Sequence, residues 1–115
     1  MSVVWLNVGG CYFATRATTL MESNTFFSGL YRMNEELDCS EIFIDRDPLH
    51  FRIILNWLRG VRYLPTDDSI LSELMFEADF YCMMDMVEAI RATRGIHPPI
   101  NKTLYEMSRN MRFDR

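Results

Sequence analysis

Residues 42–60 constrain the fold of this chain more than any other stretch of its 115 residues. An apolar strand over residues 42–44 runs into the charged tripeptide Asp45-Arg46-Asp47, and a proline follows. An amphipathic helix is predicted next, because apolar residues recur there at helical spacing. The charged residues form no recognisable catalytic constellation. The pattern is typical of a structural joint and points to an assembly module rather than an enzyme.

The residues of this joint have structural roles that explain them without chemistry. Asp47 followed by Pro48 predicts a helix start, with an N-cap acceptor before a proline at the first helical position. Gly60 predicts the end of that helix. Acid–base catalysis by Asp45, Arg46 and Asp47 is the weaker alternative. Arg46 is expected to make charge-assisted bonds to carboxylates, either within the chain or across a subunit boundary.

The rest of the chain predicts an α+β fold with a small three-stranded sheet flanked by helices. Alternating residues predict a strand over 3–8, and Gly9-Gly10 predicts a type I′ hairpin into a strand over 11–15. The third strand is expected at 41–44. Thr18 or Thr19 is expected to cap a short helix through Met21. A helix from Thr25 to about Arg32, capped by Ser23-Asn24, is expected before a loop over 33–41, and a small strand is expected over 61–65. The next predicted helix follows Thr66-Asp67-Asp68 and buries Ile70, Leu71, Leu74, Met75 and Ala78. After a break near Cys82, a last helix is predicted over about 84–93, with Met86, Val87 and Ile90 inward.

Size and composition bound the function. A chain of this length is expected to be one domain that buries roughly two-thirds of its unfolded surface. Its apolar fraction of 49% is rich for that size, which is consistent either with a dense core or with apolar surface that covers a partner. The net charge of −4 argues against nucleic acid, since phosphate binding needs clustered basic residues. No long apolar run predicts a membrane helix.

Cysteine and histidine usage argues against a metal site or cofactor. Cys11, Cys39 and Cys82 are far apart, His50 and His97 are 47 positions apart, and no Cys-x-x-Cys pair occurs. Cys11 and Cys82 are interpreted as buried small apolar residues. A reduced intracellular protein is expected, in the cytoplasm with the nucleus as the alternative.

Several motifs, in this order and spacing, resemble the BTB/POZ domain of the potassium-channel-tetramerisation (T1) type. The nearest branch is the soluble KCTD proteins and the SH3KBP1-binding protein 1 group. The resemblance covers about residues 3–93. The motifs are Val3-Val4-Trp5-Leu6-Asn7-Val8-Gly9-Gly10, Phe13, Thr19-Leu20, Phe26-Phe27, Phe43-Ile44-Asp45-Arg46-Asp47-Pro48, Phe51, Ile54-Leu55-Asn56-Trp57-Leu58-Arg59 and Glu77-Ala78-Asp79-Phe80-Tyr81.

The resemblance implies a BTB fold over residues 1–95, with 96–115 as a tail or the start of a linker. It implies a ring-shaped homo-oligomer, a pentamer or tetramer, and for many soluble members adaptor work in a cullin-3 ubiquitin ligase. The implied cullin contacts are Leu30, Tyr31, Arg32, Met33, Asn34, Phe80, Tyr81 and Met83. The implied subunit contacts are Asn7, Asp45, Arg46, Asp47 and Arg59.

Two features depart from the family pattern. Channel-type members often carry an interface zinc bound by adjacent cysteines, whereas here only Cys82 occupies that region, so the metal is not carried over. Soluble members usually have a second domain that selects a substrate, and only about 20 residues follow the fold here. The expected function is therefore a cullin-3 adaptor module, or else a pure oligomerisation domain of the channel T1 or scaffold kind without cullin binding.

Overall fold

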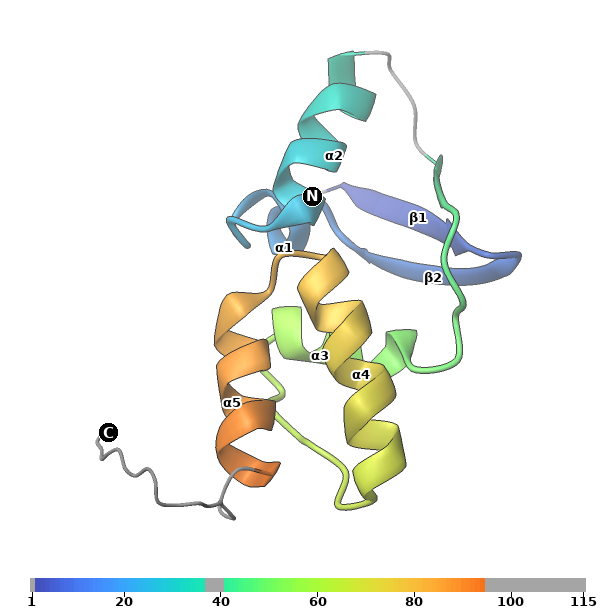
Figure 1. The fold of residues 1–115 in the computed structure, drawn as a ribbon. Helices are drawn as coiled ribbons and strands as arrows, with labels where there is room; N and C mark the ends of the chain where they lie inside the picture. Colours follow the sequence, from blue (N-terminus) through green and yellow to red (C-terminus); the bar gives the residue numbers. More distant parts are fainter. Residues whose placement is uncertain (1, 37–40, 95–115) are drawn as a thin grey trace. The chain divides into compact units, whose positions relative to one another are not determined.

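A mixed sheet of three strands forms the first half of the fold. In the computed structural model, which describes residues 2–36 and 41–94, β1 (Val3–Val8) lies between β2 (Cys11–Arg16) and β3 (Glu41–Ile44). β1 runs antiparallel to β2 and parallel to β3 (Figure 1). The α+β class, the sheet of three strands and the bounds of the first and third strands are as the sequence predicts.

The alternation along β1 separates the two faces of the sheet. Val4, Leu6 and Val8 are buried, whereas Val3 and Trp5 are about half exposed. Gly9 and Gly10 have φ of 55° and 100°, which are values that a type I′ turn requires. The predicted hairpin is therefore confirmed, and the turn fixes which face of β2 meets the core.

Gly9 also ties the hairpin to the joint that follows β3. Its backbone N–H donates to the Ile44 carbonyl at 3.0 Å. A Cβ atom at this position would lie 2.4 Å from the carbonyl oxygen of Arg46, which is closer than real Cβ contacts come. A side chain at position 9 would therefore push residues 45–48 away from the sheet.

The first two helices begin at caps other than those predicted. α1 (Ala17–Met21) has Arg16 at its N-cap and no side-chain cap, so the prediction of Thr18 or Thr19 is wrong. α2 (Phe26–Glu36) is capped by Thr25, whose hydroxyl accepts from the Phe27 N–H at 3.1 Å. The Ser28 hydroxyl accepts from the Thr25 N–H at 3.2 Å in return. This reciprocal pair replaces the predicted cap at Ser23-Asn24.

α2 is also longer than predicted. The loop expected over 33–41 is helical as far as Glu36, and residues 37–40 lie outside the described part.

α3 (Phe51–Leu58) starts later than the sequence suggests. Asp47 accepts a hydrogen bond from the Leu49 N–H at 2.9 Å, so it caps the turn over 47–50 rather than the helix. The predicted end is confirmed, because Gly60 has φ of 93° and the Val61 N–H donates to the Asn56 carbonyl at 2.8 Å. The strand expected over 61–65 does not form.

α4 (Asp68–Phe80) has the predicted start and ends in a turn at Cys82. The Asp67 carboxylate accepts from the N–H groups of Ser69 and Ile70. Cys82 has a left-handed φ of 58°, and the Met83 N–H donates to the Ala78 carbonyl at 2.9 Å.

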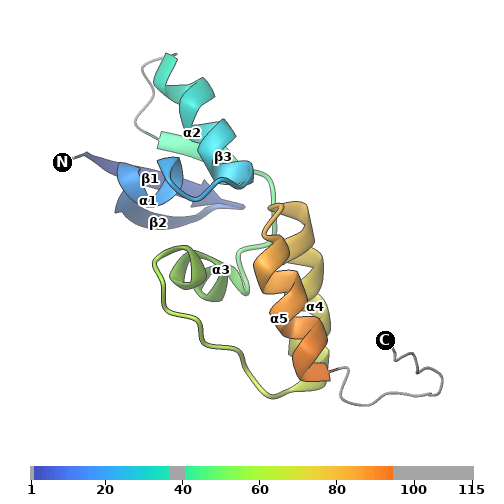
Figure 2. The same cartoon turned by 90° about the vertical axis from the view of Figure 1, so that its left-hand side faces the viewer.

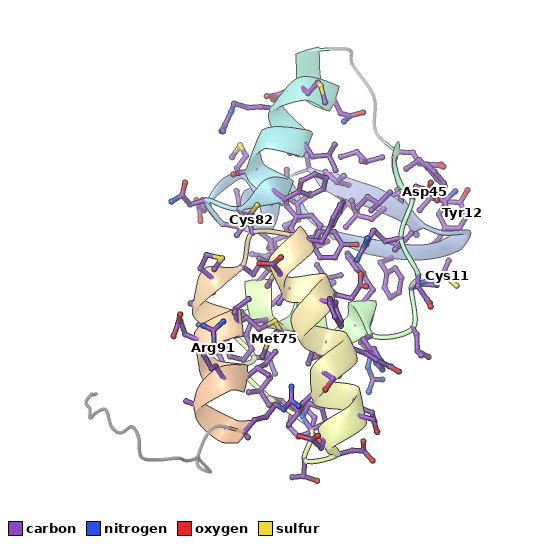
Figure 3. All side chains as sticks on the ribbon, in the orientation of Figure 1. Cys11, Tyr12, Asp45, Met75, Cys82 and Arg91 are labelled. Carbon is purple, nitrogen blue, oxygen red and sulfur yellow. The ribbon has the colours of Figure 1, made fainter. Side chains whose placement is uncertain are left out.

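The prediction of buried cysteines is wrong at both described positions. Cys82, at this turn, and Cys11, at the hairpin tip, are exposed (Figure 3). Each sits where the backbone reverses direction, so neither side chain is carried into the core.

An aromatic cluster forms the core between the sheet and these helices. Phe13 of β2 and Phe51 of α3 have ring centroids 4.9 Å apart, which places α3 against the inner face of the sheet (Figure 2). Phe27 stacks on Tyr81 at 4.6 Å and meets Phe51 edge-on at 5.9 Å. Apolar composition is thus partly explained by a dense core.

The chain divides into two compact units, and the first ends at Met84. α5 (Met84–Arg94), which belongs to the second unit from Asp85 onward, buries Met86, Val87 and Ile90, as predicted. Domain bounds of 1–95 and a tail over 96–115 stay predictions, since the residues after 94 lie outside the described part.

Gly9→Ala is expected to destabilise the fold by at least about 2 kcal/mol more than Gly10→Ala. Both positions have positive φ, but a Cβ atom at Gly10 meets nothing within 4 Å. The pair therefore isolates the close approach to Arg46 from backbone strain. Urea unfolding of both variants measures the difference, and equal losses would contradict a tight contact at Gly9.

Candidate functional site: protein interaction surfaces

Arg46 links the end of the sheet to the end of α4. Its Nε and Nη2 atoms donate to the two carboxylate oxygens of Glu77 at 3.1 and 2.9 Å. Its guanidinium carbon lies 4.1 Å from the ring centroid of Phe80. The Arg46 and Glu77 side chains are only 29% and 18% exposed, so little water screens the pair. Arg46 thus makes the within-chain bonds that the sequence offered as one of two alternatives.

The apolar row, formed by Phe80, Phe26, Leu30 and Met33, runs from the end of α4 along α2. The Phe26 ring lies 5.2 Å from that of Phe80, and the Phe26 N–H donates to the Tyr81 carbonyl at 3.1 Å. Leu30 and Met33 follow Phe26 at spacings of four and seven, so they share its side of the helix. Phe80 is 40% exposed and Met33 is 55% exposed, which leaves both ends of the row open to solvent.

The structure separates the predicted cullin contacts into surface and core residues. Arg32, Met33 and Phe80 are exposed, and Leu30, Tyr31 and Asn34 are partly exposed on α2. Tyr81 and Met83 are each 1% exposed, so their side chains offer a partner no surface. Phe26, which joins the two segments, is absent from the sequence-based set. The position of Phe26 at the start of an amphipathic helix is the sequence feature that could have identified it as a surface contact.

Tyr81 carries an unsatisfied polar group. Its hydroxyl is buried without a hydrogen-bond partner, alone in this among the residues that the structure describes. Burial, followed by the nearby Glu77 carboxylate, raises the pKa of the Tyr81 hydroxyl well above its ordinary value, although Arg46 opposes this. The aromatic ring therefore contributes packing, while the hydroxyl opposes folding.

The sheet face, formed by Val3, Trp5, Tyr12 and Phe43, is the second exposed apolar surface. These side chains are 56%, 49%, 55% and 60% exposed. Two polar residues lie among them. The Asn7 amide donates to the Tyr12 hydroxyl at 3.3 Å, and that hydroxyl donates to Glu41 at 3.2 Å, which fixes polar groups across all three strands.

The predicted subunit contacts lie around this face and the joint. Asn7 is on the sheet face, and Asp45 and Asp47 are exposed beside the hairpin end, where Figure 3 also shows Tyr12. Arg59 donates to the Ala14 carbonyl at 2.6 Å and to Asn56 at 3.2 Å. Because β2 is an edge strand, Arg59 also covers part of its free edge.

A third exposed apolar surface was not predicted from the sequence. Leu49 and Phe76 are 70% and 74% exposed, the highest values for large apolar side chains among the described residues. They line one pocket of about 220 Å³ together with Asp47, His50, Glu73 and Glu77. The sequence contains a signal for the exposure of Phe76, because this residue falls outside the predicted inward-facing positions of its helix.

None of these surfaces resembles a catalytic or metal centre. Within residues 2–36 and 41–94, no three His, Cys, Asp or Glu side chains gather as metal ligands. His50 Nε2 and Glu73 Oε1 approach to 2.6 Å at the pocket rim, but no described serine, threonine or cysteine lines the pocket with them. No helix of the described part is long and apolar enough to cross a bilayer.

Comparison with known proteins gives the family. The family model described as BTB/POZ domain matches residues 4–90, which cover the sheet, the joint and α1 to α4. This chain belongs to the BTB/POZ domain family. It is 39% identical over 99 residues to FH protein interacting protein FIP2 of Arabidopsis thaliana, covering 81% of this chain and 33% of that protein. It is 32% identical over 94 residues to KCTD5 of Homo sapiens, covering 76% of this chain and 40% of that protein.

A further relative covers more of the chain. The potassium channel regulatory protein of Bos taurus is 36% identical over 118 residues, covering 94% of this chain and 43% of that protein. These relatives confirm the T1-type resemblance. BTB/POZ domains are protein-interaction and self-association modules, not enzymes. The chain spans between a third and about two fifths of the length of these relatives.

A double-mutant cycle is expected to show strong coupling between Arg46 and Glu77. Arg46→Met and Glu77→Gln should couple by about 1–3 kcal/mol, because each single change leaves a partly buried charge unpaired. The exposed Arg91–Glu88 pair, 60% and 68% exposed, is the matched control and should couple by less than about 0.5 kcal/mol. Equal coupling in the two cycles would contradict a structural role for Arg46.

Tyr81→Phe is expected to leave stability unchanged or raise it by up to about 1 kcal/mol. The change removes a buried hydroxyl without a partner and keeps the ring. The folded pKa of Tyr81 lies above the ordinary value of 10.0, so the unfolded chain loses this proton first as pH rises. Wild-type stability should therefore fall relative to Tyr81→Phe above pH 10. A clear loss in the variant at neutral pH would contradict the unpaired hydroxyl.

Proposed function

We propose that this BTB/POZ domain assembles into a homo-oligomeric ring, a pentamer or tetramer, that recruits cullin-3 as an adaptor in a ubiquitin ligase. The proposed compartment is the cytoplasm. The observation that carries the proposal is the apolar row, because it joins both segments that the family resemblance assigns to cullin contact. Its residues come from α2 and the end of α4, which one backbone hydrogen bond holds together.

The physical character of the row suits a partner. Interfaces draw most of their affinity from a few apolar and aromatic anchors surrounded by polar residues. Phe80 is such an anchor, since Phe26, Tyr81 and Arg46 hold its ring while 40% of the side chain stays exposed. A ring held in this way loses little conformational entropy on binding. Met33 adds an adaptable contact at the other end.

Self-assembly is supported by apolar surface that lies apart from the row. The sheet face presents Trp5 and Phe43 beside Asn7, one of the proposed subunit contacts. A cyclic ring uses heterologous contacts, in which one surface meets a different surface on the next copy. Surfaces separate from the row leave the cullin contacts open on every subunit of such a ring.

A pure oligomerisation domain is the second candidate. The relative named potassium channel regulatory protein covers 94% of this chain, and its name places that protein with channels rather than ligases. In this alternative the row would serve another partner or none. Cullin-3 binding separates the two candidates.

The deciding experiment is light scattering after size exclusion, with and without the purified N-terminal domain of cullin-3. We expect a pentamer or tetramer that shifts to a larger, stoichiometric complex. An oligomer that ignores cullin-3 at micromolar concentration would leave the assembly module. A monomer would contradict the ring.

Met33→Ala and Phe80→Ala are each expected to weaken cullin-3 binding by at least about tenfold, in keeping with the loss of an interface anchor. Met21→Ala is the matched control, because Met21 is 41% exposed on α1 and lies outside the row. Titration calorimetry gives the affinities, and size exclusion checks that the oligomer persists. Unchanged binding in both variants would show that cullin-3 contacts some other surface.

A further inference from the structure

The pocket beside α4 combines features that suit a cationic apolar partner. We name it the acidic groove, formed by Asp47, Leu49, His50, Glu73, Phe76 and Glu77. Leu49 and Phe76 flank it with apolar side chains that are 70% and 74% exposed. Of its three carboxylates, Glu77 is paired with Arg46 and Glu73 lies 2.6 Å from His50 Nε2, while Asp47 and Glu73 are also exposed at the rim. Such a groove would take an arginine side chain next to an apolar one.

The same chain carries a segment of the opposite character. Residues 59–63, Arg-Gly-Val-Arg-Tyr, form the basic segment between α3 and α4, and all five are exposed. Val61 is 54% exposed and Tyr63 is 64% exposed. Arg59 and Arg62 add two positive charges, and no acidic residue interrupts them. The segment therefore combines apolar side chains with arginines, and the groove combines apolar side chains with carboxylates.

The two surfaces lie at opposite ends of one helix. The turn over 47–50, which forms part of the groove, immediately precedes α3, and the basic segment follows its last residue closely. Eight helical residues separate them by about 12 Å at 1.5 Å per residue. The segment leaves α3 from the end remote from the groove, so the complementary partner is the groove of another copy. Contacts of this head-to-tail kind generate rings.

We infer that the basic segment of one subunit docks in the acidic groove of the next and forms a heterologous contact of the homo-oligomer. This inference rests on the proposed self-assembly and names the surfaces that carry it. Arginines of the segment face Asp47 and Glu73, while Val61 and Tyr63 cover Leu49 and Phe76. Arg59, held on the Ala14 carbonyl and Asn56, presents its remaining N–H groups at the start of the segment.

Charge exchange tests the pairing. Glu73→Lys and Arg62→Glu should each raise the dissociation constant between subunits at least about tenfold, since like charges then meet across the contact. The double variant should restore the wild-type mass in light scattering. Glu88→Lys, on the exposed face of α5, is the matched control and should leave the mass unchanged.

Mixing experiments test the head-to-tail geometry. A groove variant, Leu49→Ala with Phe76→Ala, and a segment variant, Val61→Ala with Tyr63→Ala, should each be monomeric. Their mixture should give a 1:1 dimer that does not close, because one intact groove meets one intact segment. The truncated side chains are all more than half exposed, so the core is retained, and circular dichroism with thermal unfolding checks this.

The outcomes separate this inference from the proposed function. A wild-type oligomer whose groove and segment variants keep its mass would overturn the docking contact while self-assembly stands. Variants that keep the oligomer but lose cullin-3 binding would reassign the groove to that partner and also overturn the contact. A monomeric wild-type chain would remove both the ring and this interface.

Discussion

The bidentate pair between Arg46 and Glu77 holds the joint after β3 against α4. Arg46 leaves the end of β3, Glu77 lies one turn before the end of α4, and the guanidinium also covers the Phe80 ring. On the other side, the Arg46 carbonyl leaves no room for a side chain at Gly9. One residue thus fixes a hairpin, a joint and a helix end. Because arginine presents a planar fork that lysine lacks, the position requires its geometry as well as its charge.

This arrangement determines where partners can bind. The pair sets the position of Phe80, and Phe26 connects Phe80 to the exposed side of α2. The apolar row therefore depends on a contact that no partner needs to touch. The same joint delivers Asp47 and Leu49 to the edge of the acidic groove, where Asp47 holds the turn by accepting from the Leu49 N–H. A change at Arg46 would thus disturb two surfaces through the fold, which distinguishes a positioning role from a direct subunit contact.

The sequence predicts the elements whose signals are local. Alternation along β1, the two glycines of the hairpin and the acceptor at Asp67 each specify their structure within a few residues, and the structure follows them. Predictions failed where two local options compete. Ser23 uses its hydroxyl on the Leu20 carbonyl at the end of α1, which leaves Thr25 to cap α2. Cys82 takes a left-handed turn that glycine usually occupies, so composition gave no warning of its exposure. Family resemblance named Tyr81 and Met83 as contacts, but only the packing of the helix ends shows them to be core.

The residues that the sequence singles out as subunit contacts are polar, whereas the surfaces best suited to self-association are apolar. The polar candidates form bonds inside the subunit: Arg46 to Glu77, Asp47 to Leu49, and Arg59 to the edge of β2. A side chain already bonded in this way gains less by meeting another copy, because part of its hydrogen-bonding capacity is used inside the subunit. Exposed apolar groups are still in contact with water in the free subunit, so their burial on association lowers the free energy. Leu49 and Phe76 in the groove, and Val61 and Tyr63 on the segment, therefore have more free energy to gain from association than the charged residues that the sequence made conspicuous.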